Sequence, residues 1–322
     1  MNKILADFID KYALYMLHRK RSSFWQFKNS IEETEYFDVF YSSPDLPDIK
    51  FQEKDQLNGY SMGRYSFKSQ MSTVDICNIN SSGLYYRSNE GKNSVNVICI
   101  NGWRSSSHKK LQSIYLKEFM KLNYNIYFVT LPYHMERNSS HALYDGEFMI
   151  SADIDRTLLA IKQAVLDTRA LIRWIKDKNG EVILIGLSLG GLISNLIGVT
   201  ERKVDKLVSI FYANNLSYTI WDTIPGRYIK ADFEKHGFTY EELKRKWQII
   251  NPSNFTPVIR KDNILLLTAI YDKYVHKKDS DILWEAWGRP QRVLMNCGHS
   301  GIVLCRENIR NSSVSFIRDL RK

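Results

Sequence analysis

A glycine-rich turn around Ser188 holds the first side chain that could do covalent chemistry. The segment Gly186-Leu187-Ser188-Leu189-Gly190-Gly191 follows the apolar run 182–185 and precedes the helix-like stretch 192–197. A sharp turn between a strand and a helix exposes the side chain at its middle position, and the residues two positions away must be small. The turn also puts the hydroxyl at a helix N-terminus, where negative charge is stabilised. We therefore predict that Ser188 is a nucleophile.

Two residues further along the chain could activate this serine. A serine hydroxyl needs a general base, and a neutral histidine base needs an acid that orients it. His299 follows the strand-like run 292–295 and is flanked by Gly298 and Ser300-Gly301. Asp272 comes just after the apolar run 264–270. Serine, acid and histidine then follow one another in an order in which such triads occur, so we predict that Asp272 orients His299.

Acyl transfer also requires hydrogen-bond donors for the oxygen of the tetrahedral intermediate. We expect one donor from the backbone N–H of Leu189, directly after the nucleophile. The loop after the apolar run 95–100 reads Asn101-Gly102-Trp103-Arg104 and would supply the second donor from the Trp103 N–H. The Arg104 side chain could hold an acidic group of a substrate.

Apolar runs that alternate with helical stretches predict the elements that position these residues. The strand-like runs cover residues 95–100, 125–130, 182–185, 207–212, 264–270 and 292–295. Helical patterns cover about 151–176 and 301–321. This alternation predicts an α/β protein with a mostly parallel central sheet and helices on both faces. In such sheets the loops at the carboxyl ends of the strands build the site.

The first 58 residues are predicted as a helical and extended segment packed on a body that comprises 59–322. Residues 3–20 have apolar side chains at helical spacing. Such a stripe with a basic end could lie on a membrane, but we favour packing against the protein itself. Residues 41–58 are polar and predicted as a loop. Residues 60–68 and 75–86 are predicted as an antiparallel β-pair.

The Ser188 turn, the late Asp272 and the final Gly298-His299 together resemble the α/β-hydrolase superfamily over about residues 60–322. The resemblance implies the α/β-hydrolase fold and a serine hydrolase that uses neither a metal nor a cofactor. One departure is Asn101, where many members carry histidine before the glycine. Because this loop contributes through its backbone, asparagine is compatible with activity.

Three further segments resemble the branch of the superfamily around α/β-hydrolase domain-containing protein 18. They are Leu131-Pro-Tyr-His-Met-Glu-Arg137, the helix with Asp155-Arg-Thr157 and Gln163-Ala-Val165, and Leu283-Trp-Glu-Ala-Trp287. The branch implies a hydrolase fold without a settled substrate. On this resemblance His134 and Arg137 lie on a loop at the carboxyl end of a strand. There they could bind substrate or anchor the loop, and the sequence leaves both open.

Residues 214–257 interrupt the rhythm of strands and are predicted as a small helical lid insertion. The segment is rich in aromatic residues. They are Tyr218, Trp221, Tyr228, Phe233, Phe238, Tyr240 and Trp247. These rings could face a substrate pocket, but for most of them we favour packing against the body.

Composition narrows the class of partner. The chain has 322 residues and a formal net charge of +10, but its basic residues are spread out and no nucleic-acid motif accompanies them. No apolar run is long enough to span a bilayer, so no stable membrane insertion is expected. Two acids within the first ten residues speak against a secretory signal, and four cysteines form no disulfide framework. We expect a cytoplasmic protein without a nucleic-acid partner, which could form a homo-oligomer.

The sequence thus predicts a serine hydrolase that cleaves carboxylic esters or thioesters of small molecules. The same triad also serves peptidases and acyltransferases, so these activities stay open. A non-catalytic binding protein on a hydrolase scaffold is a further alternative.

Overall fold

A single mixed sheet forms the centre of the molecule. The computed structural model describes residues 2–19, 27–31, 36–57, 59–73, 75–89 and 95–318. Within these ranges the sheet has nine strands in the order β1-β2-β3-β5-β4-β6-β7-β8-β9. The strands are β1 (Lys50–Leu57), β2 (Tyr60–Lys68), β3 (Asn80–Ser88), β4 (Val95–Ile100), β5 (Asn125–Thr130), β6 (Glu181–Leu187), β7 (Lys206–Ile210), β8 (Ile264–Ala269) and β9 (Gln291–Met295). β1, β2, β3 and β5 pair antiparallel, and the strands from β5 through β9 run parallel.

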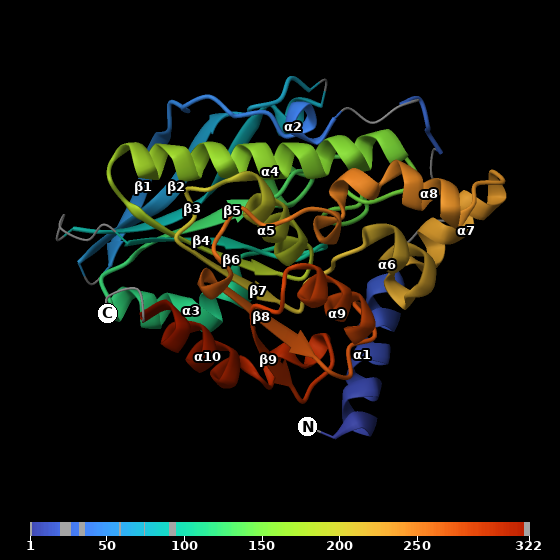
Figure 1. Cartoon of the computed structure of the whole chain (residues 1–322). Helices are drawn as coiled ribbons and strands as arrows, with labels where there is room; N and C mark the ends of the chain where they lie inside the picture. Colours follow the sequence, from blue (N-terminus) through green and yellow to red (C-terminus); the bar gives the residue numbers. More distant parts are fainter. Residues whose placement is uncertain are drawn as a thin grey trace.

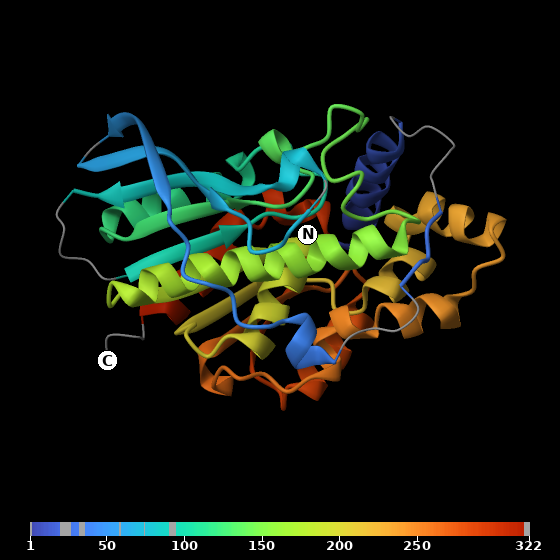
Figure 2. The same cartoon turned by 90° about the horizontal axis from the view of Figure 1, so that it is seen from above.

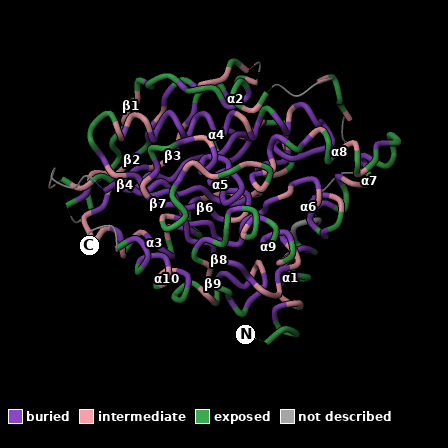
Figure 3. The backbone as a smooth tube through the Cα atoms, in the orientation of Figure 1, coloured by how far each residue is buried: buried purple, intermediate pink, exposed green. Residues whose placement is uncertain are grey.

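Helices cover both faces of this sheet, as predicted (Figure 1). α4 (Ile154–Asp177) and α5 (Leu189–Thr200) lie on one face, and α3 (Lys109–Lys121) and α10 (Arg306–Arg318) lie on the other. The central strands β4, β6 and β7 are buried along almost their whole length (Figure 3), because each presents apolar side chains to helices on both sides. The structure confirms the predicted α/β-hydrolase type of fold.

The edge strand β1 differs from the sequence prediction. Residues 50–57 were expected to belong to a polar loop, but they pair with β2. Nearly all of their side chains are exposed, so the apolar alternation that marks a half-buried strand is missing. Backbone hydrogen bonds hold this strand instead, and a sequence pattern does not reveal them.

The segment before β1 follows α4 across the molecule (Figure 2). It includes the short helix α2 (Phe37–Phe40). The Asp155 carboxylate accepts hydrogen bonds from the backbone N–H groups of Ser30 and Ile31. The Arg169 guanidinium donates to the carbonyl of Tyr41 over 2.7 Å. Polar side chains on α4 therefore fix the path of a segment that has little regular structure.

The N-terminal helix α1 (Lys3–His18) forms where it was predicted but packs through a different face. Ala6, Asp10 and Leu14 are its buried residues. Most of the apolar residues that were expected to hold it on the body are exposed instead, and Ile9 is half-buried. The buried face contacts the short turn η7 (Ser300–Val303), which directly follows His299.

A helical insertion separates β7 from β8. It contains α6 (Leu216–Asp222), η3 (Ile224–Gly226), α7 (Arg227–Lys235) and α8 (Tyr240–Lys246). Several of its aromatic side chains contact one another, with Phe233 touching Trp221, Phe238 and Trp247. α9 (Lys277–Ala286) follows β8. Within the described ranges, no helix is both long and apolar enough to cross a membrane.

A buried ion pair joins α4 to the loop after β5. Arg137 Nη2 lies 3.1 Å from Asp167 Oδ2, and both side chains are almost fully buried. Burial raises the pKa of Asp167, and the Arg137 guanidinium opposes that rise. Ser69 Oγ and the Gln70 N–H also donate to the same carboxylate. The pair thus connects α4 to the chain after β2 as well.

Replacing Arg137 with methionine should destabilise the protein strongly. The change keeps much of the side-chain volume but leaves the Asp167 carboxylate without its cation. We expect the free energy of unfolding in urea to fall by about 3–5 kcal/mol. Arg260→Met is the control, because the Arg260–Asp262 pair is exposed and should contribute less than about 1 kcal/mol. Equal losses in the two variants would contradict a structural role for the buried pair.

Candidate active site

The turn between β6 and α5 holds Ser188 in a strained backbone conformation. Its φ is 57° and its ψ is −114°, values that non-glycine residues rarely adopt. Two glycines make the turn sterically possible. A Cβ atom on Gly186 would lie 2.2 Å from the Gly190 carbonyl oxygen, and one on Gly190 would lie 2.2 Å from the Ile100 carbonyl oxygen. The small residues that the sequence showed at these positions are thus required by close backbone packing.

Ser188, His299 and Asp272 form a continuous chain of hydrogen bonds. Ser188 Oγ lies 3.0 Å from His299 Nε2, and His299 Nδ1 lies 2.7 Å from Asp272 Oδ2. A tautomer with the proton on Nδ1 donates to Asp272 and leaves Nε2 to accept the serine proton. The structure therefore brings the three predicted residues together in the order that base activation of a serine requires.

The environment of Asp272 and His299 keeps both side chains in place. Asp272 Oδ1 accepts from the backbone N–H groups of Tyr274 and Val275, each over 2.8 Å. The Tyr274 ring stacks on the His299 imidazole with a centroid distance of 4.6 Å. The His299 side chain keeps about 13% of its surface exposed, against 2% for Asp272. Asp272 is therefore buried, while the His299 ring remains partly accessible.

The predicted oxyanion donors lie on the two segments that meet at Ser188. A Cβ on Gly102 would be 3.0 Å from the Ser188 Cβ, so the 101–104 loop touches the nucleophile turn. In the described part of the chain, neither the Leu189 N–H nor the Trp103 N–H has a hydrogen-bond partner. Asn101 Nδ2 contacts His108 Nδ1 over 2.9 Å. At this departure from the superfamily pattern, asparagine thus has a buried structural partner.

A cavity of about 360 Å³ opens beside Ser188 and His299. Arg104 lines it, as do Ser106, Lys110 and Tyr274. The Arg104 guanidinium lies over the Tyr144 ring, 3.6 Å from its centroid. The predicted substrate-binding residue Arg104 therefore borders this space, and the cavity wall is polar and basic on its side.

A second, smaller space lies on the apolar side of Ser188. Its volume is about 50 Å³, and Ser188, Leu189 and Trp103 form one wall. The opposite wall is largely apolar and belongs mainly to α6 and neighbouring loops. It includes Ile150, Ala213, Leu216, Ile220 and Val275. Ser188 thus lies between a small apolar space and a larger, partly polar one.

His134 and Arg137 anchor a loop rather than line either cavity. His134 is 1% exposed, and burial lowers its pKa to about 4. Its neutral ring contacts the Pro132 carbonyl through Nδ1 and accepts from the Arg104 N–H through Nε2. Arg137 donates to the Thr130 carbonyl and pairs with Asp167. Of the two possibilities that the sequence left open, the structure favours anchoring for both residues.

Sequence analysis missed one carboxylate at this site. Asp10 of α1 is fully buried and accepts from the backbone N–H groups of Lys273, His299 and Ser300. Burial raises its pKa, the N–H of Ser300 opposes the rise, and the charge of Asp272 adds to it. A Cβ on Gly298 would lie 2.6 Å from Asp10 Oδ2, so only glycine allows this approach. The sequence held one sign of this role, because Asp10 is an acidic residue within the apolar pattern of residues 3–16.

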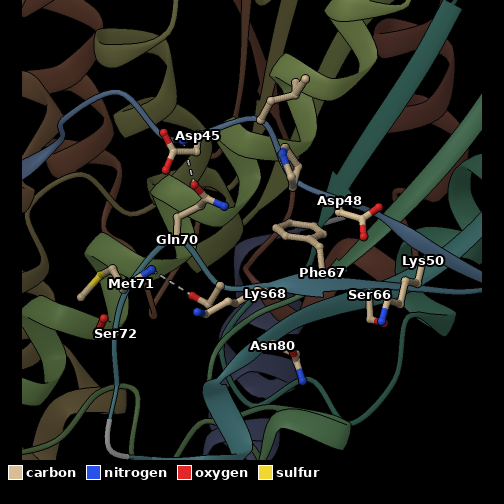
Figure 4. A pocket seen from close by; sticks show the side chains of 13 residues that line it. Asp45, Asp48, Lys50, Ser66, Phe67, Lys68, Gln70, Met71, Ser72 and Asn80 are labelled. Carbon is tan, nitrogen blue, oxygen red and sulfur yellow. Dashed lines mark hydrogen bonds between the residues drawn. The ribbon is translucent and has the colours of Figure 1, made fainter.

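A larger hollow lies at the antiparallel end of the sheet, away from Ser188 (Figure 4). It has a volume of about 590 Å³ and runs between residues 45–50 and β2. Gln70 closes part of it by accepting from the Asp45 N–H. The residues that line it include no histidine or cysteine that could act as a base or nucleophile. Among the described residues, no group of three His, Cys, Asp or Glu side chains could hold a metal ion.

Comparisons with known proteins identify relatives without an assigned activity. No family model matches the chain. The uncharacterized protein YdjC of Bacillus subtilis (strain 168) is 57% identical over 113 residues, which are 35% of this chain and 97% of YdjC. The uncharacterized protein Rv2627c of Mycobacterium tuberculosis is 29% identical over 197 residues. This match covers 58% of the chain but less than half, 44%, of Rv2627c. None of these relatives bears on the narrower resemblance to the branch around α/β-hydrolase domain-containing protein 18.

Solved structures share the fold at low sequence identity. Acetyl xylan esterase 1 of Thermoanaerobacterium sp. JW/SL YS485 is 15% identical with a TM-score of 0.62, over 85% of this chain and 93% of the esterase. An acetyl xylan esterase of Paenibacillus sp. R4 is 13% identical with a TM-score of 0.63, over 92% of this chain and 98% of the esterase. Pyrococcus horikoshii acylaminoacyl peptidase is 13% identical with a TM-score of 0.59, over 83% of this chain and 42% of the peptidase. The chain therefore has the fold of these hydrolases and belongs to the family of Bacillus subtilis YdjC.

Proposed function

We propose that this protein is a serine hydrolase that cleaves carboxylic esters or thioesters through an acyl-enzyme on Ser188. The observation that carries the proposal is the hydrogen-bond chain from Ser188 Oγ through His299 to the buried Asp272. The strained backbone of Ser188 supports the proposal, because strained residues persist only where the surrounding structure enforces them, and they cluster at active sites.

Acylation begins when His299 Nε2 takes the Ser188 proton as Oγ attacks the substrate carbonyl carbon. The carbonyl oxygen becomes an oxyanion, and the N–H groups of Leu189 and Trp103 donate to it. Asp272 stabilises the imidazolium that forms. His299 then gives its proton to the departing alcohol or thiol, which leaves Ser188 acylated.

Deacylation repeats these steps with water as the nucleophile. His299 Nε2 removes a proton from the water molecule, and the resulting hydroxide attacks the acyl carbon. The second tetrahedral intermediate collapses, Ser188 recovers its proton from His299, and the carboxylic acid leaves. The stacked Tyr274 ring keeps the imidazole facing the reacting atoms in both halves of the cycle.

The two cavities around Ser188 suggest how a substrate lies in the site. The apolar space of about 50 Å³ suits the acyl group, because it is the smaller of the two and its wall is largely apolar. The larger cavity with Arg104 and Lys110 suits a polar or acidic leaving group. The proposed substrates are therefore esters or thioesters with a short acyl chain.

Two observations favour a hydrolase over the alternatives. Peptidases and acyltransferases use the same triad, but the small apolar space offers no room for a bulky amino-acid side chain on the acyl side. A non-catalytic binding protein has no need for a serine in a strained turn that is hydrogen-bonded to a histidine–carboxylate pair.

Ser188→Ala should abolish turnover while the protein stays folded. The change removes only the nucleophilic oxygen, so hydrolysis of p-nitrophenyl acetate should fall by roughly 10³-fold or more. A fluorophosphonate probe should label wild type at Ser188 and leave the variant unlabelled. Ser106→Ala serves as the control, because this serine lines the cavity without contacting His299. Equal turnover by wild type and Ser188→Ala would refute the assignment, and a folded wild type inert to the probe would favour a binding protein.

Activity should also depend on acyl-chain length. With p-nitrophenyl esters we expect kcat/KM to be highest for acetate and to fall through butyrate to octanoate, because longer chains exceed the apolar space. Ile220→Ala enlarges that space and should move the optimum towards butyrate. Leu294→Ala, on the exposed side of β9, should leave the profile unchanged. A wild-type preference for octanoate would contradict the short-acyl proposal.

A further inference from the structure

The outward face of α1 consists of large apolar side chains that are exposed to solvent. Ile4 is 82% exposed, Phe8 67%, Tyr12 59% and Tyr15 65%. These positions recur every three or four residues, so they form one stripe along the helix. Leu5 and Met16 flank it and are also exposed. An apolar surface of this extent on a protein marks an interaction site.

The helix does not need this stripe to stay on the protein. A surface helix ordinarily buries its apolar side and exposes its polar side. In α1 the buried positions are Ala6, Asp10 and Leu14, which repeat every four residues on the opposite side. The contacts of these buried residues hold the helix on the protein, and the apolar stripe therefore faces outward.

Charge favours an anionic surface as the partner of this stripe. Lys11 and Arg19 lie beside the stripe at helical spacing, and the sequence continues with Lys20-Arg21. Of the two acids on the helix, Asp10 is buried and Asp7 pairs with Lys273. Aromatic and aliphatic residues bordered by unopposed basic residues are the pattern of helices that lie in the interface of anionic membranes.

The same helix also borders the candidate active site, through the side that faces the protein. α1 contacts η7, whose Val303 is exposed, as is the adjacent Leu304. Ala13 of α1 lines the same cavity as Ser188 and His299.

We propose that α1 docks this protein peripherally on an anionic lipid surface, with Ile4, Phe8, Tyr12 and Tyr15 inserted among the headgroups. The docking does not depend on the proposed hydrolase activity, because it is a binding property of the helix.

Co-sedimentation of the full chain with vesicles tests this proposal. Wild type should sediment with vesicles that contain phosphatidylglycerol and much less with pure phosphatidylcholine, and added salt should weaken the binding. The double variant Phe8→Asp/Tyr12→Asp should lose at least about tenfold in partitioning, because each change puts a charge on the inserted face. Ile76→Asp is the matched control, since Ile76 is 84% exposed but far from α1 in the sequence.

Two results would overturn the membrane assignment. One is equal sedimentation of wild type and the double variant. The other is a concentration-dependent dimer in analytical ultracentrifugation that Phe8→Asp/Tyr12→Asp dissociates, without vesicle binding by wild type. That outcome would assign the stripe to a second copy of this chain. Because the mutated side chains are exposed, circular dichroism should show an unchanged fold in the double variant.

A separate observation concerns the buried side of the same helix. The Asp10 carboxylate accepts from the N–H groups of His299 and Ser300 at 3.0 and 2.8 Å, and from that of Lys273 at 3.1 Å. The first two belong to the loop of the triad base, and the third directly follows the triad acid. One carboxylate thus joins the two loops whose side chains must meet.

We infer that Asp10 is a positioning residue for the His299–Asp272 pair. It touches no reacting atom and acts by fixing the separation of the two loops. Misplacing a catalytic group by about 1 Å can cost 10²-fold in rate, so the consequence of losing this link should appear in kcat. This inference rests on the proposed hydrolase function.

Asp10→Asn tests it with little change in volume. The amide nitrogen cannot accept a hydrogen bond, so it must face either the Ser300 N–H that Oδ1 accepts from or the Lys273 and His299 N–H groups that Oδ2 accepts from. In either orientation at least one of the three links is replaced by two opposed donors. We expect kcat for p-nitrophenyl acetate to fall by roughly 10- to 100-fold with KM nearly unchanged. Leu14→Ala is the control on the same buried face, and it should lower the melting temperature while kcat stays near the wild-type value.

The possible outcomes separate this inference from the function on which it rests. An inactive wild type would refute the hydrolase proposal itself. An active wild type with an equally active Asp10→Asn would refute the positioning role alone. If kcat and melting temperature fall together, and by similar amounts, in Asp10→Asn and Leu14→Ala, then Asp10 contributes only to stability and the positioning role is refuted. If Asp10→Asn does not fold, Asp10→Ser, which keeps one oxygen acceptor, is measured in the same way.

Discussion

The close approach of the β6–α5 turn to the end of β4 is the constraint on which the rest of the site depends. Gly190 packs so tightly on the Ile100 carbonyl that no side chain fits between them. This contact forces Ser188 into its strained conformation and brings Gly102 against it. Parallel pairing then places the ends of β8 and β9 along the same edge, so that Asp272 and His299 arrive from neighbouring loops.

The sequence predicted those parts of the fold whose causes are local. β4 and β5 have the same bounds as the apolar runs expected for them, and the glycines of the turn around Ser188 show in the sequence that the turn allows no larger side chains. β1 was missed because an exposed edge strand has no apolar pattern to detect. The orientation of α1 was missed because an apolar stripe ordinarily faces the protein, whereas here a buried carboxylate determines which face packs.

Several buried polar residues hold loops in place, among them His134 and Arg137, which the sequence left open as substrate-binding residues. Gln163 donates to Ser69 and to the Asn78 carbonyl, and Asp167 receives Arg137. Each of these buried groups has partners, which removes much of the free-energy cost of burying it. A sequence motif records that a polar residue is needed at a position. It does not distinguish a residue that touches substrate from one that shapes the wall behind it, and His134 is the clearest example.

The contact between Asp10 and His299 joins positions that are 289 residues apart in the chain. During synthesis the first helix leaves the ribosome long before the loop that receives its carboxylate has been translated. Contacts of such long range form late, since the entropy of closing the loop must be overcome first. The proposed site can therefore assemble only after the His299 loop has been released, so a nascent chain that stops short of this loop carries Ser188 without its hydrogen-bond partner.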